Sequence, residues 1–263
     1  TTTTIDYCED DVASVLTATA TAGHTLVWYG SDGTTVLGGA PTPSTSVVTP
    51  TNYYVAQKNT LTDCVGPQAT ITVTVSSTPV APTVSDVSYC LNDAATALTA
   101  TALTGHTLVW YDASQAGITT PTPSTSSVGP ITYYVAQATA SGCEGPKSLV
   151  TVTINALPVA PVATSTIAYC KDATATALTA TASGSHTLVW YDTDGTTVLS
   201  GAPTPSTSSV GNTPYYVAQK KTSTGCVGPQ STITVSINPL PVVPSTTTTI
   251  DYCEDDVASV LTA

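Results

Sequence analysis

The stretch HTLVWY, residues 24–29, occurs again without change at residues 106–111 and 186–191. Two further motifs, YYVAQ and Cys-x-Gly-Pro, recur at the same intervals. Their first residues are Tyr53, Tyr133 and Tyr215 for YYVAQ, and Cys64, Cys143 and Cys226 for Cys-x-Gly-Pro. The chain is therefore an array of units of about 80 residues, and a period of this length indicates a repeat architecture.

Proline-rich joints of sequence Pro-Val-x-Pro separate the units, at residues 79–82, 158–161 and 241–244. We therefore predict three repeats and the start of a fourth, with the boundaries 1–80, 81–159, 160–243 and 244–263. The last segment is not a further sequence variant of the repeat, because residues 246–263 are identical to residues 1–18. We expect the chain to be a fragment of a longer array in which blocks of three units are duplicated.

The composition excludes two classes of partner. Charged residues make up only 8% of the chain, and the net charge is −12 with five Lys and Arg residues in total. Nucleic acid and anionic lipid both need clustered cations, which this sequence lacks. No stretch approaches the ~18 uninterrupted apolar residues that a membrane span needs. We therefore expect no nucleic-acid partner and no membrane insertion in this segment.

Within each unit, apolar and polar residues alternate with the period of a strand. In VLTATAT, residues 15–21, Leu16, Ala18 and Ala20 alternate with threonines, and PTPSTSVV at 41–48 reads as an extended edge. Runs rich in Thr and Val fit the exposed face of a pleated sheet. We count about seven short strands in each repeat and no helix. The pattern predicts an all-β chain of tandem β-sandwiches arranged end to end.

Two aromatic positions narrow the sandwich to the immunoglobulin-like type. A tryptophan on the third strand and a tyrosine entering the sixth, two residues before an inward position, are typical of that core. In antibody domains the inward position is a cysteine paired with one on the second strand, and here Ala18 and Val55 match that pair. We predict a small apolar contact there in place of the core disulfide. The predicted core aromatics are Trp28, Trp110, Trp190, Tyr53, Tyr133 and Tyr215.

The combined pattern of Tyr-Cys, LTAT, LVWY, YYVAQ, Cys-x-Gly-Pro and TVTV resembles the immunoglobulin-like repeats of giant Bacteroidetes cell-surface adhesins. These include gliding-motility adhesins exported by the type IX secretion system. The resemblance covers essentially the whole chain. It implies a long surface filament and an extracellular, cell-surface location, and the duplicated block of sequence is consistent with both.

The seven cysteines alternate between the Tyr-Cys pairs and the Cys-x-Gly-Pro motifs: Cys8, Cys64, Cys90, Cys143, Cys170, Cys226 and Cys253. In an immunoglobulin-like topology Cys8 and Cys64 lie at opposite ends of the domain, roughly 25 Å apart, whereas a disulfide needs Cα atoms within ~7 Å. The favoured register is therefore inter-domain, Cys8–Cys143 and Cys90–Cys226. Counting alone leaves a within-repeat register open, Cys8–Cys64, Cys90–Cys143 and Cys170–Cys226. Either register places the chain outside the cytosol.

The sequence contains no constellation for catalysis, so we predict no enzyme and no cofactor. The histidines His24, His106 and His186 share one position at the start of the tryptophan strand, and we expect them to be hydrogen-bonded or solvated. DTDG at 192–195 opens like a calcium loop but lacks the downstream Glu, so a hairpin turn explains it better. The acidic turn EDD at 9–11 leaves calcium at domain junctions as an open alternative.

Two classes of function remain. In the first, the repeats are structural spacers of an extracellular filament or adhesin stalk for adhesion or gliding, and their partners are neighbouring repeats and other copies of the filament. In the second, each sandwich binds carbohydrate or surface polysaccharide weakly and is repeated for avidity. Exposed aromatics discriminate between the two, and we favour cross-strand packing over sugar binding for six outward tyrosines. These are Tyr29, Tyr111, Tyr191, Tyr54, Tyr134 and Tyr216.

Overall fold

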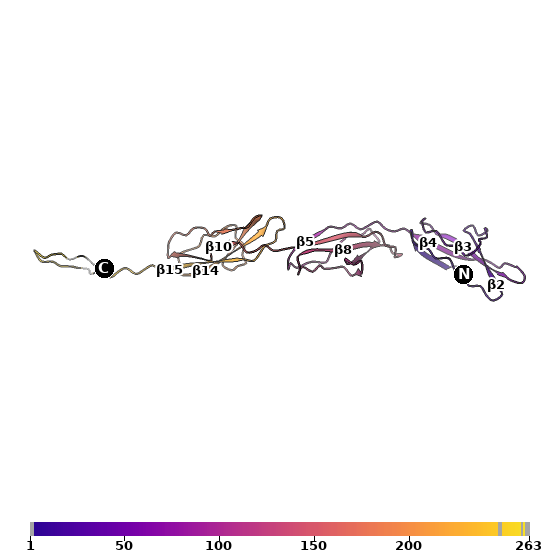
Figure 1. Ribbon diagram of the computed structural model, residues 1–263, viewed down its shortest axis with the longest axis horizontal. Coiled ribbons are helices and arrows are strands. Elements are labelled where there is room, and N and C mark those ends of the chain that lie inside the picture. The colour runs from indigo at the N-terminus through magenta and orange to yellow at the C-terminus, as the bar shows by residue number, and fades with distance from the viewer. Residues whose placement is uncertain (1–2, 247–248, 259, 261–263) are drawn as a thin grey trace. The chain divides into compact units, whose positions relative to one another are not determined.

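The structure is a computed structural model that describes residues 3–246, 249–258 and 260. Every regular element in that part of the chain is a β-strand, so the predicted all-β class is confirmed. The chain forms two compact units, Thr1–Ile154 and Asn155–Ala263 (Figure 1). The predicted start of a fourth repeat, 244–263, falls partly on residues 247–248, 259 and 261–263, which lie outside the described residues. The repeat boundaries stay a prediction.

The first sheet of unit Thr1–Ile154 has four strands in the spatial order β1-β4-β3-β2. Their bounds are Thr3–Cys8 for β1, His24–Tyr29 for β2, Thr51–Asn59 for β3 and Ala69–Ser76 for β4. The β2–β3 and β3–β4 pairs are antiparallel, whereas β1 runs parallel to β4. This parallel pairing sets Cys8 opposite Ser76, at the C-terminal end of β4.

The second sheet of the same unit repeats this topology, in the order β5-β9-β8-β6-β7. Its strands are β5 (Val87–Cys90), β6 (Thr107–Tyr111), β7 (Gly117–Ile118), β8 (Gly129–Ala138) and β9 (Ser148–Asn155). The same sequence motifs therefore occupy equivalent strands in the first two repeats.

Unit Asn155–Ala263 contains a sheet of order β11-β15-β14-β13, in which β11 and β15 are again parallel, and a two-stranded ladder of β10 and β12. The bounds are β10 Val162–Ala163, β11 Thr166–Cys170, β12 Ala180–Thr181, β13 His186–Tyr191, β14 Gly211–Lys221 and β15 Ser231–Asn238. The third repeat thus has the parallel first-to-last pairing seen in the first.

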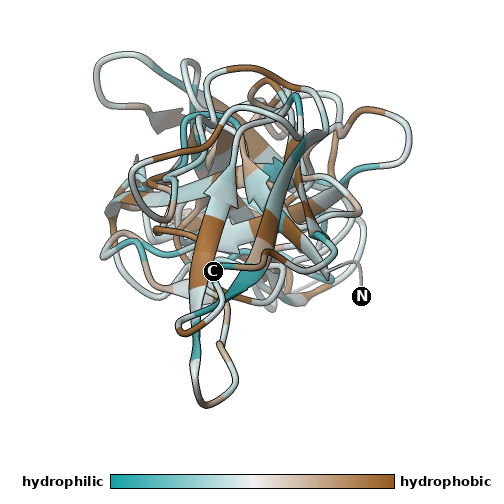
Figure 2. Cartoon of the chain, turned by 90° about the vertical axis from the view of Figure 1, so that its right-hand side faces the viewer, coloured by the Kyte–Doolittle hydropathy of each residue, from teal (hydrophilic) through white to brown (hydrophobic). Residues whose placement is uncertain are grey.

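Each four- or five-stranded sheet carries its own hydrophobic core around the repeated tryptophan. Trp28 on β2 lies opposite Val55 on β3, and both are buried together with Leu16 from the segment before β2. The remaining predicted core residues behave alike: Trp110 and Trp190 are buried, and Tyr53, Tyr133 and Tyr215 pack half-buried against the three cores. Figure 2 shows brown, hydrophobic strand segments and mainly pale loops.

The first repeat has fewer regular strands than the expected count of about seven. The missing strands belong to the layer that faces the first sheet. Residues 15–21 and 41–48 form no regular ladder, and an isolated hydrogen bond of 2.9 Å runs from the Leu16 N–H to the Pro41 carbonyl. Because Pro41 and Pro43 have no N–H to donate, a continuous ladder cannot form along this edge. Leu98 with Pro121 and Leu178 with Pro203 repeat the contact. One buried leucine in each repeat therefore attaches this layer to the sheet, with little help from backbone hydrogen bonds.

Replacing Leu16 with Ala should therefore destabilise the first repeat. The Leu16 side chain is 2% exposed, and truncating a buried leucine costs about 2–5 kcal/mol. Leu61 is 93% exposed, so Leu61→Ala should change the free energy of unfolding by less than about 0.5 kcal/mol. Urea unfolding followed by tryptophan fluorescence measures both variants. Equal effects of the two would contradict this assignment of the core.

Candidate junction between successive repeats

The joint at residues 79–82 lies on the second repeat and is bound by its side chains. The Val80 carbonyl accepts a hydrogen bond of 2.7 Å from Gln137 Nε2, and the Pro82 carbonyl accepts one of 2.6 Å from Ser148 Oγ. Gln137 is fully buried, and its Oε1 accepts a hydrogen bond from the Leu103 N–H at 2.7 Å. The oxygen and the nitrogen of this buried amide thus both have hydrogen-bond partners. The oxygen has its partner within the repeat, and the nitrogen has its partner in the joint.

The joint at residues 158–161 is bound to the third repeat in the same manner. Gln219 Nε2 donates to the Val159 carbonyl at 2.7 Å, and Ser231 Oγ donates to the Pro161 carbonyl at 2.6 Å. Gln219 is also fully buried. The glutamine of YYVAQ and the serine two residues after Cys-x-Gly-Pro therefore form a seat for the joint, a role that the sequence analysis did not assign to either.

The glycine of Cys-x-Gly-Pro is required by the close approach of the joint. A Cβ atom on Gly145 would lie 1.9 Å from the carbonyl oxygen of Pro79, and one on Gly228 would lie 2.2 Å from that of Pro158. Both oxygens belong to backbone, which cannot rotate away. The backbone of this turn therefore lies directly under the joint in the second and third repeats, and only glycine fits there.

Beyond the joint, the chain pairs with the segment that precedes the tryptophan strand. Thr83 and Thr101 exchange two backbone hydrogen bonds of 3.2 and 2.9 Å. The short ladder of β10 with β12 is the counterpart in the third repeat. A joint and the residues after it therefore form part of the repeat that follows them.

The structure contains a disulfide between Cys8 of the first repeat and Cys143 of the second, with a Cα–Cα distance of 5.4 Å. Cys8 ends β1, and its ladder partner Ser76 has a carbonyl oxygen 3.9 Å from Cys143 Sγ. Cys143 is 2% exposed. The inter-domain pair that we favoured from the sequence is therefore present in the structure.

The within-repeat alternative is wrong for Cys8–Cys64, Cys90–Cys143 and Cys170–Cys226, because Cys143 is bonded to Cys8 and both Cys64 and Cys170 are free. The parallel pairing of β1 with β4 gives the physical reason. Cys8 lies beside the end of β4, whereas Cys64 precedes its start, and the 8 residues of β4 span about 24 Å at ~3.4 Å per step.

The other cysteines fall into two groups. Cys90 and Cys226 are each disulfide-bonded, and the pairing Cys90–Cys226 stays a prediction. Cys64, Cys170 and Cys253 are free and exposed. Disulfide bonds of this kind persist in oxidising compartments, so the chain belongs to an extracellular or secreted protein.

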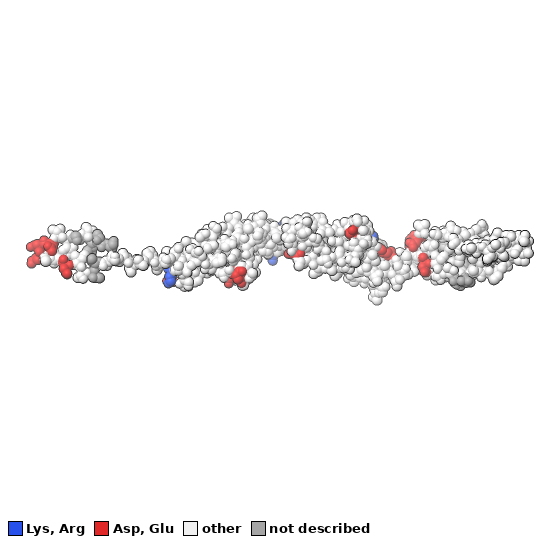
Figure 3. Space-filling model, turned by 90° about the horizontal axis from the view of Figure 1, so that it is seen from below, with Lys and Arg blue, Asp and Glu red and all other residues white. Residues whose placement is uncertain are grey.

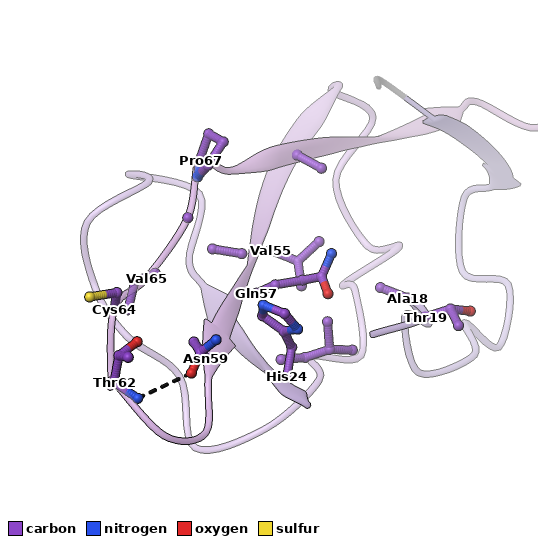
Figure 4. Close-up of a pocket in the computed structure, with 14 residues that line it drawn as sticks. Ala18, Thr19, His24, Val55, Gln57, Asn59, Thr62, Cys64, Val65 and Pro67 are labelled. Atoms are coloured by element: carbon purple, nitrogen blue, oxygen red, sulfur yellow. Dashed lines mark hydrogen bonds between the residues drawn. The ribbon is translucent and has the colours of Figure 1, made fainter. Parts of the chain in front are cut away.

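The first repeat has an open groove at the place where the other repeats hold a joint. It encloses about 520 Å³ and is lined by Ala18, Thr19, His24, Val55, Gln57 and Gly66, among others. Figure 4 shows the Gln57 amide in this space and the Cys64 sulfur turned away from it. Ala18 is exposed, so the predicted contact that closes Ala18 onto Val55 is wrong. The volume of this groove, which Ala18 and Val55 both line, is large enough to hold another stretch of backbone.

The six outward tyrosines are cross-strand partners: Tyr29 with Tyr54, Tyr111 with Tyr134 and Tyr191 with Tyr216. All six are half-buried. A turn glycine lies close to two of these rings: a Cβ on Gly33 would lie 3.4 Å from Tyr54, and one on Gly195 would lie 3.5 Å from Tyr216.

In the second repeat a charged group covers the tyrosine instead. Lys147 Nζ lies 3.3 Å from the centre of the Tyr111 ring, whose hydroxyl donates to Glu144. Burial and this hydrogen bond raise the pKa of Tyr111 to about 12. Tyr54, Tyr111 and Tyr216 are thus each in close contact with a neighbouring residue of their own repeat.

The candidate polar residues serve as local hydrogen-bond partners. Nδ1 of His24 lies 3.1 Å from the Ala22 carbonyl, and His106 has the equivalent contact with Thr104. His186 contacts the carbonyl of Ser183, which lies one position earlier. In DTDG, Asp194 accepts hydrogen bonds from the side chain and backbone of Thr197 and from the backbone of Thr196. These bonds hold the pKa of Asp194 well below its usual value. The segment is thus a side-chain-capped turn, as predicted.

The acidic EDD turn is organised by its own carboxylate. Asp11 Oδ2 accepts the Cys8 N–H at 2.7 Å, and Asp10 adopts a positive φ of 64°. Within the described residues, no three His, Cys, Asp or Glu side chains are gathered as a metal site would require. The described part of the chain also has no helix with the length and hydrophobicity of a membrane span. Figure 3 shows a mostly uncharged surface with scattered acidic groups.

A family model described as "Ig-like domain CHU_C associated" matches residues 79–156 and 158–239, more than half of the 263 residues. Immunoglobulin domains 1–4 of Sidekick-1 are 13% identical with a TM-score of 0.29, covering 90% of this chain and 74% of theirs. Fibronectin(III)-like modules of Clostridium thermocellum CbhA are 13% identical with a TM-score of 0.34, covering 59% of this chain and 91% of theirs. A search of the curated proteins found no match.

Replacing Gly145 with Ala should destabilise the second repeat, because the new methyl group would meet the Pro79 carbonyl. Overpacking of this kind costs about 1–3 kcal/mol. Gly66 is the matched control, since its Cβ would lie at an ordinary 3.6 Å from the Gln57 carbonyl oxygen. Gly66→Ala should therefore change the free energy of unfolding by less than about 0.5 kcal/mol. Urea unfolding distinguishes the two variants, and equal costs would contradict the seat.

Non-reducing proteolysis with mass spectrometry should recover one peptide that contains Cys8 joined to Cys143 and another that contains Cys90 joined to Cys226. Alkylation before digestion should label Cys64, Cys170 and Cys253, which are free and exposed. A peptide that joins Cys8 to Cys64 would contradict the inter-domain register.

Proposed function

The chain belongs to the family of CHU_C-associated Ig-like domains, and from this premise we propose that its repeats are structural spacers of a long extracellular filament or adhesin stalk. Immunoglobulin-like repeats of this kind are typically non-enzymatic structural modules. The filament extends from the surface of a Bacteroidetes cell, is exported by the type IX secretion system, and serves adhesion or gliding. Its partners are neighbouring repeats and other copies of the filament.

The junction between the first two repeats is the observation that carries this proposal. A disulfide joins Cys8 to Cys143, and the joint between the same repeats is bound by Gln137 and Ser148. A binding module has no need of such connections, whereas a load-bearing spacer does. The proline joint supports the same reading because it is stiff even before it is bound.

The surface composition also supports a spacer. Only 8% of residues are charged, and the net charge is −12. A surface of this kind keeps an extracellular array soluble without attracting polyanions. The alternative function, a multivalent carbohydrate-binding module, is supported less well, because all six tyrosines are half-buried and three of them, Tyr54, Tyr111 and Tyr216, lie against a turn glycine or Lys147.

Force spectroscopy on the whole chain, pulled from its two ends, tests the mechanical role. The Cys8–Cys143 bond closes a loop with a sequence separation of 135 residues. This loop cannot extend until the bond is reduced, and its opening should add up to roughly 450 Å of contour length at ~3.3 Å per residue. Cys8→Ser should show only a part of this added length without reductant, because Cys90 and Cys226 stay disulfide-bonded in that variant.

Two results would count against the spacer proposal. The first is an extension curve of the wild-type chain that is unchanged by reductant. The second is saturable binding of the chain to a glycan array, lost when Tyr29 or Tyr54 is replaced with Ser, since this would favour the carbohydrate-binding alternative.

A further inference from the structure

In the first and third repeats, the strand that carries the tryptophan is the outermost strand of its sheet. The strand orders β1-β4-β3-β2 and β11-β15-β14-β13 place β2 and β13 at an edge. Both strands have the sequence HTLVWY, which contains no Asp, Glu, Lys, Arg or Pro. Soluble proteins commonly protect an exposed edge with charges or proline, because its unpaired backbone groups can pair with another chain. In the second repeat, β7 covers part of the equivalent edge.

One hydrogen bond shows which backbone groups face this edge in the first repeat. The Trp28 carbonyl accepts a bond of 2.8 Å from the Leu37 N–H, on the side of β2 that is turned away from β3. Because backbone groups alternate in direction along a strand, those of Leu26 and His24 face the same side as those of Trp28. The His24 N–H is bonded to the Thr21 carbonyl at 3.1 Å. Among the described residues, the Leu26 N–H and carbonyl, the Trp28 N–H and the His24 carbonyl have no partner on this side.

The third repeat has the same open edge. The Leu199 N–H donates to the Trp190 carbonyl at 2.8 Å, so the N–H and the carbonyl of Leu188 face the open side. This repeat holds its own joint, since Gln219 Nε2 donates to the Val159 carbonyl. The open edge is therefore a property of the complete repeat.

The free groups of this edge are complementary to those of an identical edge. When two such strands lie antiparallel with Leu26 opposite Leu26, each Leu26 N–H meets the Leu26 carbonyl of the other strand. Each Trp28 N–H then meets the His24 carbonyl of the other strand. The groups left over are the His24 N–H and the Trp28 carbonyl, and both are already bonded within their own repeat. The self-paired edge therefore leaves none of these groups without a hydrogen bond.

We propose that this edge, residues 24–28 and 186–190, pairs antiparallel with the same edge of a second copy of the chain. The inference rests on the proposed function, in which other copies of the filament are partners, and it assigns a surface to that contact. The contact is isologous, since both copies use the same strand. It continues the sheet of one repeat into the sheet of another and joins two filaments side by side.

The side chains of the edge suit this pairing. Thr25 lies opposite Val27 of the other copy, and β-branched residues are favourable cross-strand partners. Thr25 is exposed and Val27 is half-buried in the free chain. Gly23, in the turn before β2, has a positive φ of 80°, so the paired stretch ends at His24. One pairing of this length is weak, but the chain has the edge twice, and linked weak contacts gain avidity.

Charges placed at the exposed threonines of the edge test the proposal. In the antiparallel pair the Thr25 side chains of the two copies are diagonal neighbours, about 7 Å apart, and Thr187 is the equivalent residue of the third repeat. With the free thiols alkylated, sedimentation velocity should show that the wild-type chain associates as its concentration rises. Thr25→Lys with Thr187→Lys should abolish association, and so should Thr25→Glu with Thr187→Glu. An equimolar mixture of the two variants should associate again, because opposite charges then meet.

The matched control is Thr42→Lys with Thr204→Lys, which makes the same change in net charge at exposed threonines outside the edge. This control should associate like the wild-type chain. A monomeric wild-type chain, association that persists in both edge variants, or a mixture that fails to associate would overturn the proposal.

Amide hydrogen exchange locates the contact. On association the Leu26 and Trp28 amides should become protected, whereas the Val27 amide, which faces β3, should not change. Association without this protection would overturn the proposal. So would protection of these amides by an extended peptide of unrelated sequence in a chain that does not self-associate, since the edge would then belong to another partner. Force spectroscopy reads single chains, so a failure of lateral pairing is distinguishable from a failure of the spacer function.

Discussion

The buried glutamine amide at the end of YYVAQ is the interaction on which the junction depends. Its Oε1 is held by a backbone N–H of its own repeat, and its Nε2 is held by a carbonyl of the joint. A buried amide with one end unpaired would cost about 1–3 kcal/mol. A repeat without its joint is therefore incomplete in hydrogen bonding as well as in packing. The joint works as an element of the following domain and not as a passive linker.

The cysteine register follows from a second constraint, the parallel pairing of the first strand with the last. That pairing places Cys8 at the far end of β4, beside Ser76, and so away from Cys64 of its own repeat. The Cys-x-Gly-Pro turn of the next repeat is already fixed at this end, because its glycine lies under the joint. The joint and the disulfide thus connect the same two repeats. The joint orients the Cys-x-Gly-Pro turn of the second repeat, and the disulfide bonds that turn covalently to the first.

The sequence was sufficient for the fold class, the tryptophan core and the Cys8–Cys143 pair, because each rests on a spacing that backbone geometry fixes. Three features were beyond it. Residues 41–48 form no ladder because Pro41 and Pro43 have no N–H. The extended pattern of the sequence therefore predicted more strands than the structure has. Ala18 is exposed, whereas its counterpart Ala180 pairs in a short ladder with Ala163, a residue that follows the preceding joint. Gln137 has the burial of a core residue, but its acceptor Val80 lies in a different motif, 57 positions away.

The difference between Ala69 and the serines Ser148 and Ser231 gives the array an asymmetry that the motifs alone conceal. Two of the three repeats bind their joint with two side-chain hydrogen bonds, whereas the first offers only the glutamine. The seat of the first repeat therefore has one side-chain donor fewer for a joint than the seats of the other two repeats.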